Sequence, residues 1–213
     1  MKKILVLFIP VFILLTCVSC GDNRQAQQLD GTWEGGITIN YDDQSNEKQD
    51  VYQNFRYIKN DYKDGGDLIE VRSCHVKNID LDDMTMDVKY HTYIEGIWEI
   101  IAGDLYIKYN VSTLKVKVDA NDVKLHYDNV LAELNVVSDL LEGFTVYDIV
   151  DDLQKELYKD MFHEYKSDDD VDDNESTYQN LKIDGNRMSY TTADIGEITF
   201  EKKNVNVNKI FEE

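Results

Sequence analysis

The sequence has few of the residues that crosslink a chain or stiffen it locally. Its only proline is Pro10, so later turns must be made by Gly, Asn and Asp. Two of its three cysteines, Cys17 and Cys20, stand within the first twenty residues. If Cys20 begins the processed chain and is modified, Cys74 is the one remaining thiol and no internal disulfide can form. Stability must then come from packing.

Basic residues are also scarce. Lys and Arg together number 22 against 42 Asp and Glu, which gives a formal net charge of −20. Such a surface repels the phosphate backbone, so we exclude nucleic acid as a partner. It also repels anionic lipid headgroups, so we expect contact with a bilayer only through a covalent anchor.

Beyond the N-terminus the chain has no long apolar run. Lys2 and Lys3 precede an apolar stretch from Ile4 to Val18, which is the pattern of a secretory signal. The stretch is shorter than the roughly 20 apolar residues of a transmembrane helix. We therefore predict that residues 1–19 are a cleaved signal peptide.

The junction Cys17-Val18-Ser19-Cys20 resembles the lipobox of bacterial lipoproteins, although Cys17 replaces the usual leucine. The resemblance implies lipid on Cys20, membrane association through that lipid, and a place in the cell envelope at the outer membrane, on either face. Cleavage before Cys17 and an ordinary signal peptide without lipid are the alternatives. Residues 20–28 are polar and aperiodic, which predicts a lipidated tether.

Residues 29–213 suffice for a single domain, and no internal repeat divides them. From Gly31 to Tyr127 apolar residues recur with period two, as in strands that bury one face. Turn-forming clusters interrupt this pattern at residues 64–67, 82–83, 102–104 and 119–122. The segment therefore predicts a meander of about eight strands.

After Tyr127 the period becomes that of a helix. Apolar residues at 130, 134, 137 and 141 share one face, and a stronger stripe follows at Ile149, Leu153, Leu157, Met161 and Tyr165. We predict two helices within residues 129–166. The second begins near Thr145 and should bury its stripe on the strands. Strands are expected again at residues 178–183, 187–191 and 197–202.

The predicted fold class is mainly β, an antiparallel meander of about eight to ten strands with an α-helical insertion at about 129–166. Such a sheet most simply closes into a barrel or folds into a sandwich.

A few segments resemble a known family. Leu29-Asp30-Gly31-Thr32-Trp33 is similar to the Gly-x-Trp opening of lipocalins and of lipocalin-like lipoproteins of Gram-negative bacteria. The segments 96–105 and 183–200 resemble later hairpins of that group. A strand-starting turn with a core tryptophan is the simpler interpretation of the opening.

The lipocalin resemblance implies a meander β-barrel spanning residues 29–213. In that family the tryptophan closes one barrel end and packs on an arginine of a late strand. Trp33 suits the first role, whereas Arg187 stands in the penultimate predicted strand and Lys202 in the last. The second family motif, Thr-Asp-Tyr, is missing from its expected place.

The function implied by this resemblance is a membrane-anchored lipoprotein whose barrel binds a small apolar or amphipathic ligand. The interior residues expected to line that site are Trp33, Phe55, Tyr57 and Trp98. The alternative is a non-enzymatic envelope protein that binds another protein or a glycan through its surface.

No motif for catalysis or metal binding stands out. The four histidines lack metal-ligand spacing, and there is no phosphate loop or nucleophile elbow. We therefore expect no enzyme activity, no cofactor and no metal. Cys74 lies in an alternating stretch, so we expect a buried strand residue rather than a nucleophile.

The acidic run at residues 168–175 invites a calcium interpretation because calcium prefers carboxylate oxygens. Asp173 stands where an EF-hand loop needs glycine, and Gln179 stands where it needs a bidentate glutamate. A solvated acidic loop is therefore the favoured interpretation.

Lipid attachment at Cys20 can be tested directly. Metabolic labelling with a fatty acid should mark the protein, and Cys20→Ala should abolish the label and release the protein from membranes, because several acyl chains hold a domain on a bilayer. Label that persists in Cys20→Ala but is lost in Cys17→Ala would move the attachment site.

Overall fold

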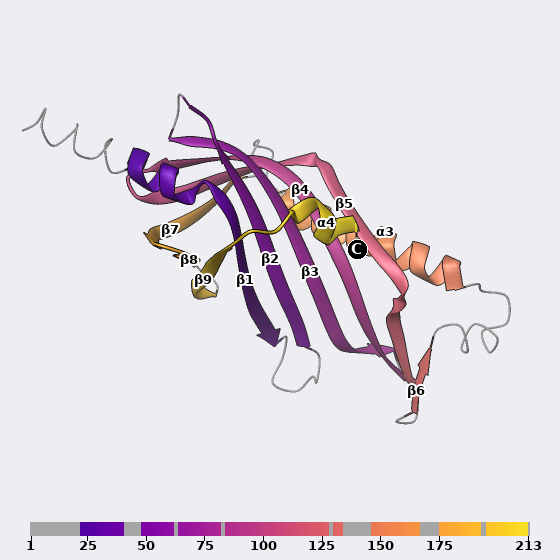
Figure 1. Cartoon of the computed structure of the whole chain (residues 1–213). Coiled ribbons are helices and arrows are strands. Elements are labelled where there is room, and N and C mark those ends of the chain that lie inside the picture. Colours follow the sequence, from indigo (N-terminus) through magenta and orange to yellow (C-terminus); the bar gives the residue numbers. More distant parts are fainter. Residues whose placement is uncertain are drawn as a thin grey trace, which may run out of the picture.

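The computed structural model describes residues 22–40, 48–61, 64–81, 84–127, 130–133, 146–166, 175–192 and 195–212. Its main feature is one antiparallel sheet, drawn in Figure 1. The strands are β1 (Gly31–Asn40), β2 (Lys48–Lys59), β3 (Gly65–Leu81), β4 (Met84–Ile101), β5 (Asp104–Tyr127), β6 (Val130–Glu133), β7 (Glu175–Asp184), β8 (Arg187–Thr192) and β9 (Gly196–Lys203). The helices are an N-terminal one at residues 22–29, α3 (Val146–Tyr165) and α4 (Val207–Glu212).

Eight of these strands form a closed ring. Strands β1 to β5 pair in sequence, β5 pairs with β7, β7 to β9 pair in sequence, and β9 returns to β1. Two of the pairings are short: β9 meets β1 only from Thr32 to Glu34, and β7 meets β5 only from Leu105 to Lys108. The mainly β, antiparallel meander is therefore confirmed.

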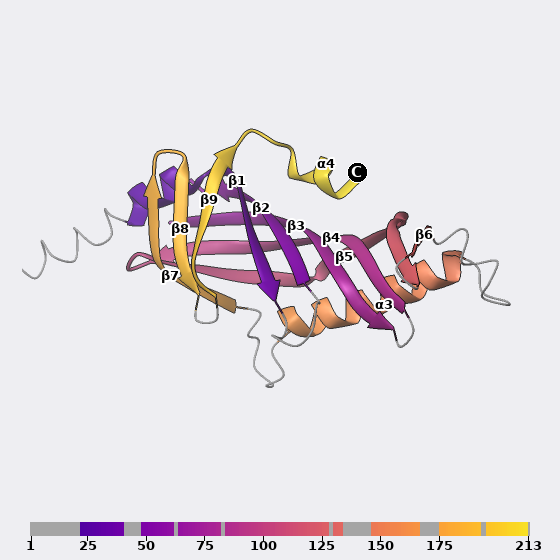
Figure 2. The same ribbon diagram turned by 90° about the horizontal axis from the view of Figure 1, so that it is seen from below.

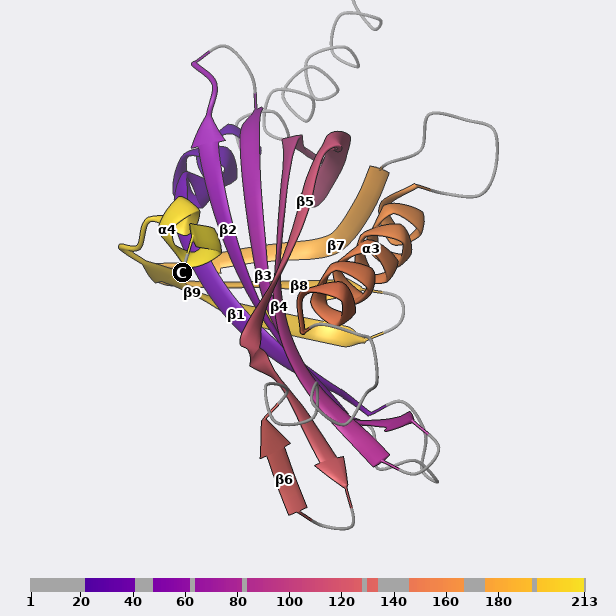
Figure 3. The ribbon, with the colours of Figure 1, turned by 90° about the vertical axis from the view of Figure 1, so that its right-hand side faces the viewer.

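The ring closes around only one half of the long strands. The paired segments of β1 and β5 are both N-terminal, so the C-terminal part of β5 and its neighbours continue as an open sheet. Figure 3 shows α3 lying in the angle between this open sheet and the crossing strands β7 to β9. We call the two parts the closed half and the open half.

The strands between Gly31 and Tyr127 are fewer and longer than predicted, since the expected turn at 119–122 is wrong and β5 continues through it. The β4–β5 register changes there, so residues 119–122 form a bulge opposite Lys89. The Asp119 carboxylate accepts hydrogen bonds from the backbone and side-chain N–H groups of Asn121. Turn-forming residues were correctly recognised, but they bend a strand instead of ending it.

The helical insertion is confirmed in its second part and wrong at its start. α3 carries the predicted stripe, whereas Val130–Glu133 forms β6 and pairs with residues 124–127 of β5. The free edge of β5 offers unpaired backbone N–H and C=O groups to residues 130–133. Hydrogen bonding to that edge outweighs a helical pattern that depends on only a few apolar residues. Residues 134–145 lie outside the described part of the chain.

The predicted tether is wrong for residues 22–28, which form a helix packed against the closed half. Ala26 and Leu29 are completely buried in its core. Only two residues of this segment are buried, so its sequence is too short to show apolar residues at helical spacing. Residues 1–19 and Cys20 lie outside the described residues.

Hydrogen bonds fasten this N-terminal helix to the turn between β4 and β5. The carboxylate of Asp22 accepts from the backbone N–H groups of Ala102 and Gly103 at 3.2 and 3.1 Å. Gln25 Nε2 donates to the carbonyl oxygen of Leu181 at 3.1 Å. None of the helices among the described residues has the length and apolarity needed to cross a bilayer.

Two apolar clusters lie on the inner face. The first fills the closed half with aromatic rings, among them Phe55, Tyr57, Tyr190 and Phe200. Gly35 is needed there, because a Cβ atom would lie only 2.4 Å from the Phe200 ring. The second cluster lies between the open half and α3 and includes buried residues Val51, Cys74, Val88 and Val123.

The α3 stripe is less buried than the sequence predicted. Leu153, Leu157 and Met161 pack against the second cluster but remain partly exposed. Tyr165, at the end of the stripe, is buried in the first cluster. Cys74 is buried in β3, as expected.

The two clusters should differ in their response to truncation. Leu105→Ala, at a fully buried position of the closed half, should lower the free energy of unfolding by about 3–5 kcal/mol. Leu157→Ala, at a half-buried position, should cost about 1–2 kcal/mol. Urea denaturation measures both, and equal losses would contradict the open packing of α3.

Candidate functional site

A cavity of about 740 Å³ lies between α3, the open half of the sheet and strands β7 to β9. α3 packs mainly along β5, so among the described residues the inner face of β1 to β3 is only partly covered by this helix. The volume falls within the roughly 300–1,000 Å³ of small-molecule sites. We call this space the α3 cavity.

The walls of the α3 cavity are apolar over most of the sheet and helix. Side chains from β1 to β4 and from α3 supply this surface: Ile37, Ile39, Val51, Cys74, Val76, Ile79, Val88, Leu153, Leu157 and Met161. Polar side chains border the rest: Gln49, Gln53, Arg72, Tyr90, Asp160, Glu164, Ser176, Thr177, Tyr178, Tyr190 and Thr192. An apolar surface with polar groups set into it suits an amphipathic molecule.

Arg72 is the centre of the polar wall. Its Nε donates to Glu70 Oε1 at 2.5 Å, and its Nη1 donates to Glu164 Oε1 of α3 at 2.6 Å. The guanidinium also lies over the Tyr165 ring, 4.9 Å from the centroid. Arg72 therefore ties α3 to β3.

Glu70 lies behind Arg72, further into the ring. Alternate residues of a strand share a face, so Glu70 points inward with Arg72 and Cys74. Its side chain is completely buried, and its Oε1 also accepts a hydrogen bond from Gln53 Nε2 at 3.4 Å. A buried carboxylate is costly unless its oxygens are satisfied.

Several buried oxygens near this carboxylate lack a protein partner. Among the described residues, Glu70 Oε2 and the hydroxyl oxygens of Tyr57, Thr92 and Tyr165 make no hydrogen bond. Most buried polar atoms in proteins are bonded to protein or ordered water, so each exception needs an explanation. A polar group of a ligand, or water in its place, would provide the missing partners.

Burial governs the ionisation of the surrounding phenols. It raises the pKa of Tyr57, Tyr109 and Tyr190 well above the ordinary value, with smaller contributions from neighbouring charges, Glu70 among them. Burial opposes the charge of Arg72, but Glu70 and the other neighbours outweigh it and raise the Arg72 pKa. At neutral pH the phenols are therefore uncharged hydrogen-bonding groups around an ion pair.

The four ligand-site residues predicted from the sequence lie together elsewhere. Trp33, Phe55, Tyr57 and Trp98 are all buried in the aromatic core of the closed half. None of them borders the α3 cavity. Phe55, Tyr57 and Trp98 pack against other rings, as in the edge-on contact of Tyr57 with Trp98, whose centroids lie 5.7 Å apart.

Trp33 makes specific contacts at the end of the closed half. Its Nε1 donates to the carbonyl oxygen of Leu29 at 2.7 Å. Lys202 of β9 places its ammonium over the indole, 5.1 Å from the ring centroid, and donates to the carbonyl oxygen of Gln28 at 3.0 Å. The basic residue on this tryptophan is therefore Lys202 of the last strand.

The residues that line the α3 cavity were not predicted from the sequence, because the sequence pattern that marks them is weak. Glu70 and Arg72 share the inward parity of Leu68 and Cys74, so β3 carries two charges on a face that is otherwise apolar. A charged residue in such a register needs a partner inside the fold. The partner on α3, Glu164, cannot be found from strand periodicity.

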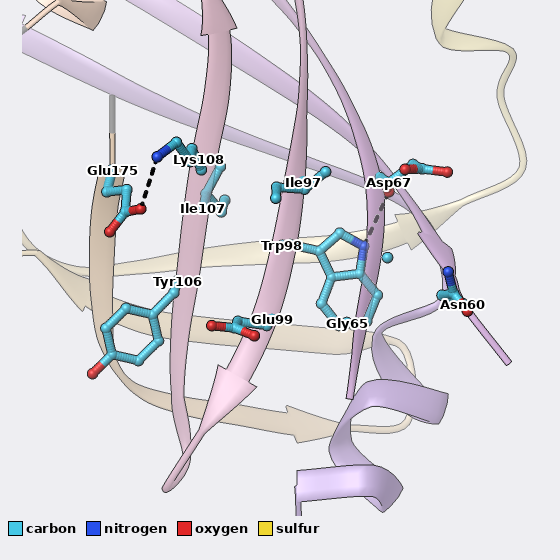
Figure 4. A pocket seen from close by; sticks show the side chains of 11 residues that line it. Asn60, Gly65, Asp67, Ile97, Trp98, Glu99, Tyr106, Ile107, Lys108 and Glu175 are labelled. Atoms are coloured by element: carbon cyan, nitrogen blue, oxygen red, sulfur yellow. Dashed lines mark hydrogen bonds and ion pairs between the residues drawn. The ribbon is translucent and has the colours of Figure 1, made fainter. Parts of the chain in front are cut away.

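A smaller depression of about 200 Å³ lies where β3, β4 and β5 run side by side, shown in Figure 4. Two of its polar side chains already have partners: Trp98 Nε1 donates to the Asp67 carbonyl oxygen at 3.0 Å, and Lys108 pairs with Glu175 at 3.3 Å. It is smaller than a usual ligand pocket. The α3 cavity is therefore the better site.

Within the described residues, no three His, Cys, Asp or Glu side chains come close enough together to hold a metal ion. The calcium question for residues 168–175 lies outside them, apart from Glu175 at the start of β7.

Comparison with known proteins adds no relative, because neither a protein-family model nor a curated protein matches the chain. The functional proposal therefore depends on the geometry of the cavity.

The buried phenols predict unfolding in alkali. Because their pKa is higher in the folded protein, the folded state keeps protons that the unfolded state releases above about pH 10. Their contribution to stability is complete below that pH and is lost as the pH rises further. The tyrosinate absorbance of these buried residues should therefore appear only above that pH. It should appear together with loss of the far-ultraviolet circular dichroism. Ionisation of all 14 tyrosines with an unchanged spectrum would contradict this burial.

Proposed function

We propose that the protein is an exported, lipid-anchored envelope protein with a lipocalin-like β-barrel, and that it binds a small amphipathic ligand in the α3 cavity. The observation that carries the proposal is the cavity itself, with about 740 Å³ of space, apolar walls and polar groups on one side. The protein would act by binding, without catalysis or a cofactor.

Two structural features support the lipocalin-like assignment. The closed half is a ring of eight antiparallel strands that follow one another along the chain. Trp33 and Lys202 are register partners of β1 and β9, with the cation over the indole. This contact is similar to the tryptophan–arginine contact of lipocalins, with lysine in place of arginine.

Lipid on Cys20 would bring the closed half close to the bilayer. Asp22 is bonded to the β4–β5 turn, so only Gly21 separates the proposed anchor from a fastened residue. An extended residue spans about 3.3–3.6 Å, which leaves almost no slack. Figure 2 shows the helix at residues 22–29 and α3 towards opposite ends of the long strands. The α3 cavity would thus face away from the membrane.

The alternative function, binding through the surface, has less support. Exposed large apolar side chains among the described residues are distributed over separate elements, for example Tyr52 on β2, Ile97 on β4 and Tyr158 on α3. Single exposed apolar residues are normal on a soluble surface. A continuous apolar patch would be the sign of a protein partner.

Filling the cavity tests the proposal. Leu157→Trp places a larger side chain in the α3 cavity and should abolish ligand binding while the fold is kept, because Leu157 is only half-buried. Native mass spectrometry of protein purified without detergent should show a bound small molecule in the parent and none in the variant.

The matched control is Tyr158→Trp, a change at the next residue of α3 that does not border the α3 cavity. It should bind ligand like the parent. If the parent carries no ligand and binds none of a set of amphipathic probes, or if Leu157→Trp binds as well as Tyr158→Trp, the cavity is not a ligand site.

A further inference from the structure

We infer that the ligand of the α3 cavity is an amphipathic cation, with an apolar body against the sheet and α3 and a protonated amine beside Glu70, Asp160 and Glu164. This inference rests on the proposed function and adds to it the chemical class of the ligand. It comes from the balance of charges at the cavity and from the buried oxygens that lack a partner.

Acidic groups outnumber basic ones around the cavity. Asp160 and Glu164 border it from α3, and Arg72 is the one basic residue among the described residues that line it. Arg72 is shared between Glu164 and the buried Glu70. The group of four therefore has an excess of negative charge, and its cation is already engaged.

The hydrogen-bonding capacity favours the same ligand. Glu70 Oε2 is buried and has no partner, and a carboxylate oxygen can only accept. An ammonium group brings three donors and no acceptor, so it can satisfy Glu70, which lies directly behind Arg72 and Gln53 of the cavity wall. The rings of Tyr178 and Tyr190 at the cavity wall add π faces that attract a cation.

An anionic head fits poorly at the same place. A fatty-acid carboxylate donates no hydrogen bond, so Glu70 Oε2 would remain without a partner. It would also compete with Glu70 and Glu164 for Arg72. An uncharged alcohol donates one hydrogen bond and should be intermediate.

Three probes with the same alkyl chain and different heads test this inference: dodecylamine, dodecanol and dodecanoate. At neutral pH the amine is protonated, as lysine is, and the carboxylate is ionised. Titration calorimetry below the micelle-forming concentration should show the amine binding at least about tenfold more tightly than the carboxylate. Tighter binding of the carboxylate would overturn the cationic head while leaving the cavity as a ligand site.

Attraction of an amine to the acidic surface must be measured separately. Leu157→Trp has the same net charge but a filled cavity, so its residual amine binding gives the surface contribution. Surface binding should also fall as salt is raised above about 0.15 M. If the parent binds all three probes no better than Leu157→Trp does, the α3 cavity is not a ligand site. That result would contradict the proposed function itself, and not only the inferred positive charge of the ligand's head group.

Removing charge at the cavity should remove the preference. In the double variant Asp160→Asn and Glu164→Gln, the amine should lose most of its advantage, to less than about threefold over the carboxylate, because Arg72 is released to bind an anion. The control double variant Asp152→Asn and Glu156→Gln removes equal charge from exposed positions of α3 and should retain the preference. An unchanged preference in the first variant, or an equal loss in both, would overturn the inference.

Discussion

The closure of the ring over only a few residues is the constraint from which the rest of the structure follows. β9 pairs with three residues of β1, while β1 pairs with β2 along its whole length. Beyond the closure, the sheet formed by β1 to β5 has an inner face that no strand of the ring covers. Apolar side chains such as Val51 and Val88 lie on that face, and leaving them in water would be costly. α3 supplies the cover, but a single helix is narrower than the sheet beneath it, so a cavity remains.

The same geometry accounts for the unusual charges inside the protein. Arg72 and Glu70 lie on β3 where the closed half ends and the cavity begins, and Glu164 reaches them from α3. Burying such ions costs free energy, and an apolar trio of similar shape would often be at least as stable. Arg72 and Glu164 line the α3 cavity, and Glu70 behind them keeps a buried carboxylate oxygen without a partner, which fits the proposed ligand binding better than a role in stability.

The N-terminal helix and α4 have different roles at the margins of the sheet. The helix at residues 22–29 closes the ring end where Trp33 and Lys202 meet, and its first residue is fastened to the β4–β5 turn. α4 covers a small apolar cluster around Val71 and Tyr93 on the other face of the sheet. α3, which forms one wall of the cavity, thus lies towards the end of the long strands opposite to the N-terminal helix.

By itself the sequence determined the features that depend on near neighbours. Period two predicted the antiparallel strands, the stripe from Ile149 to Tyr165 predicted α3, and the strands expected at residues 178–183 and 187–191 correspond to the late hairpin of β7 and β8. Only the tertiary structure decided how the ring closes, where α3 lies, and that the α3 cavity lies beside the aromatic core instead of within it. The contact of Arg72 with Glu164 joins positions 92 residues apart, and no local pattern records such a pairing. Side-chain periodicity identifies the inward face of a strand, but what covers that face depends on the path of the whole chain.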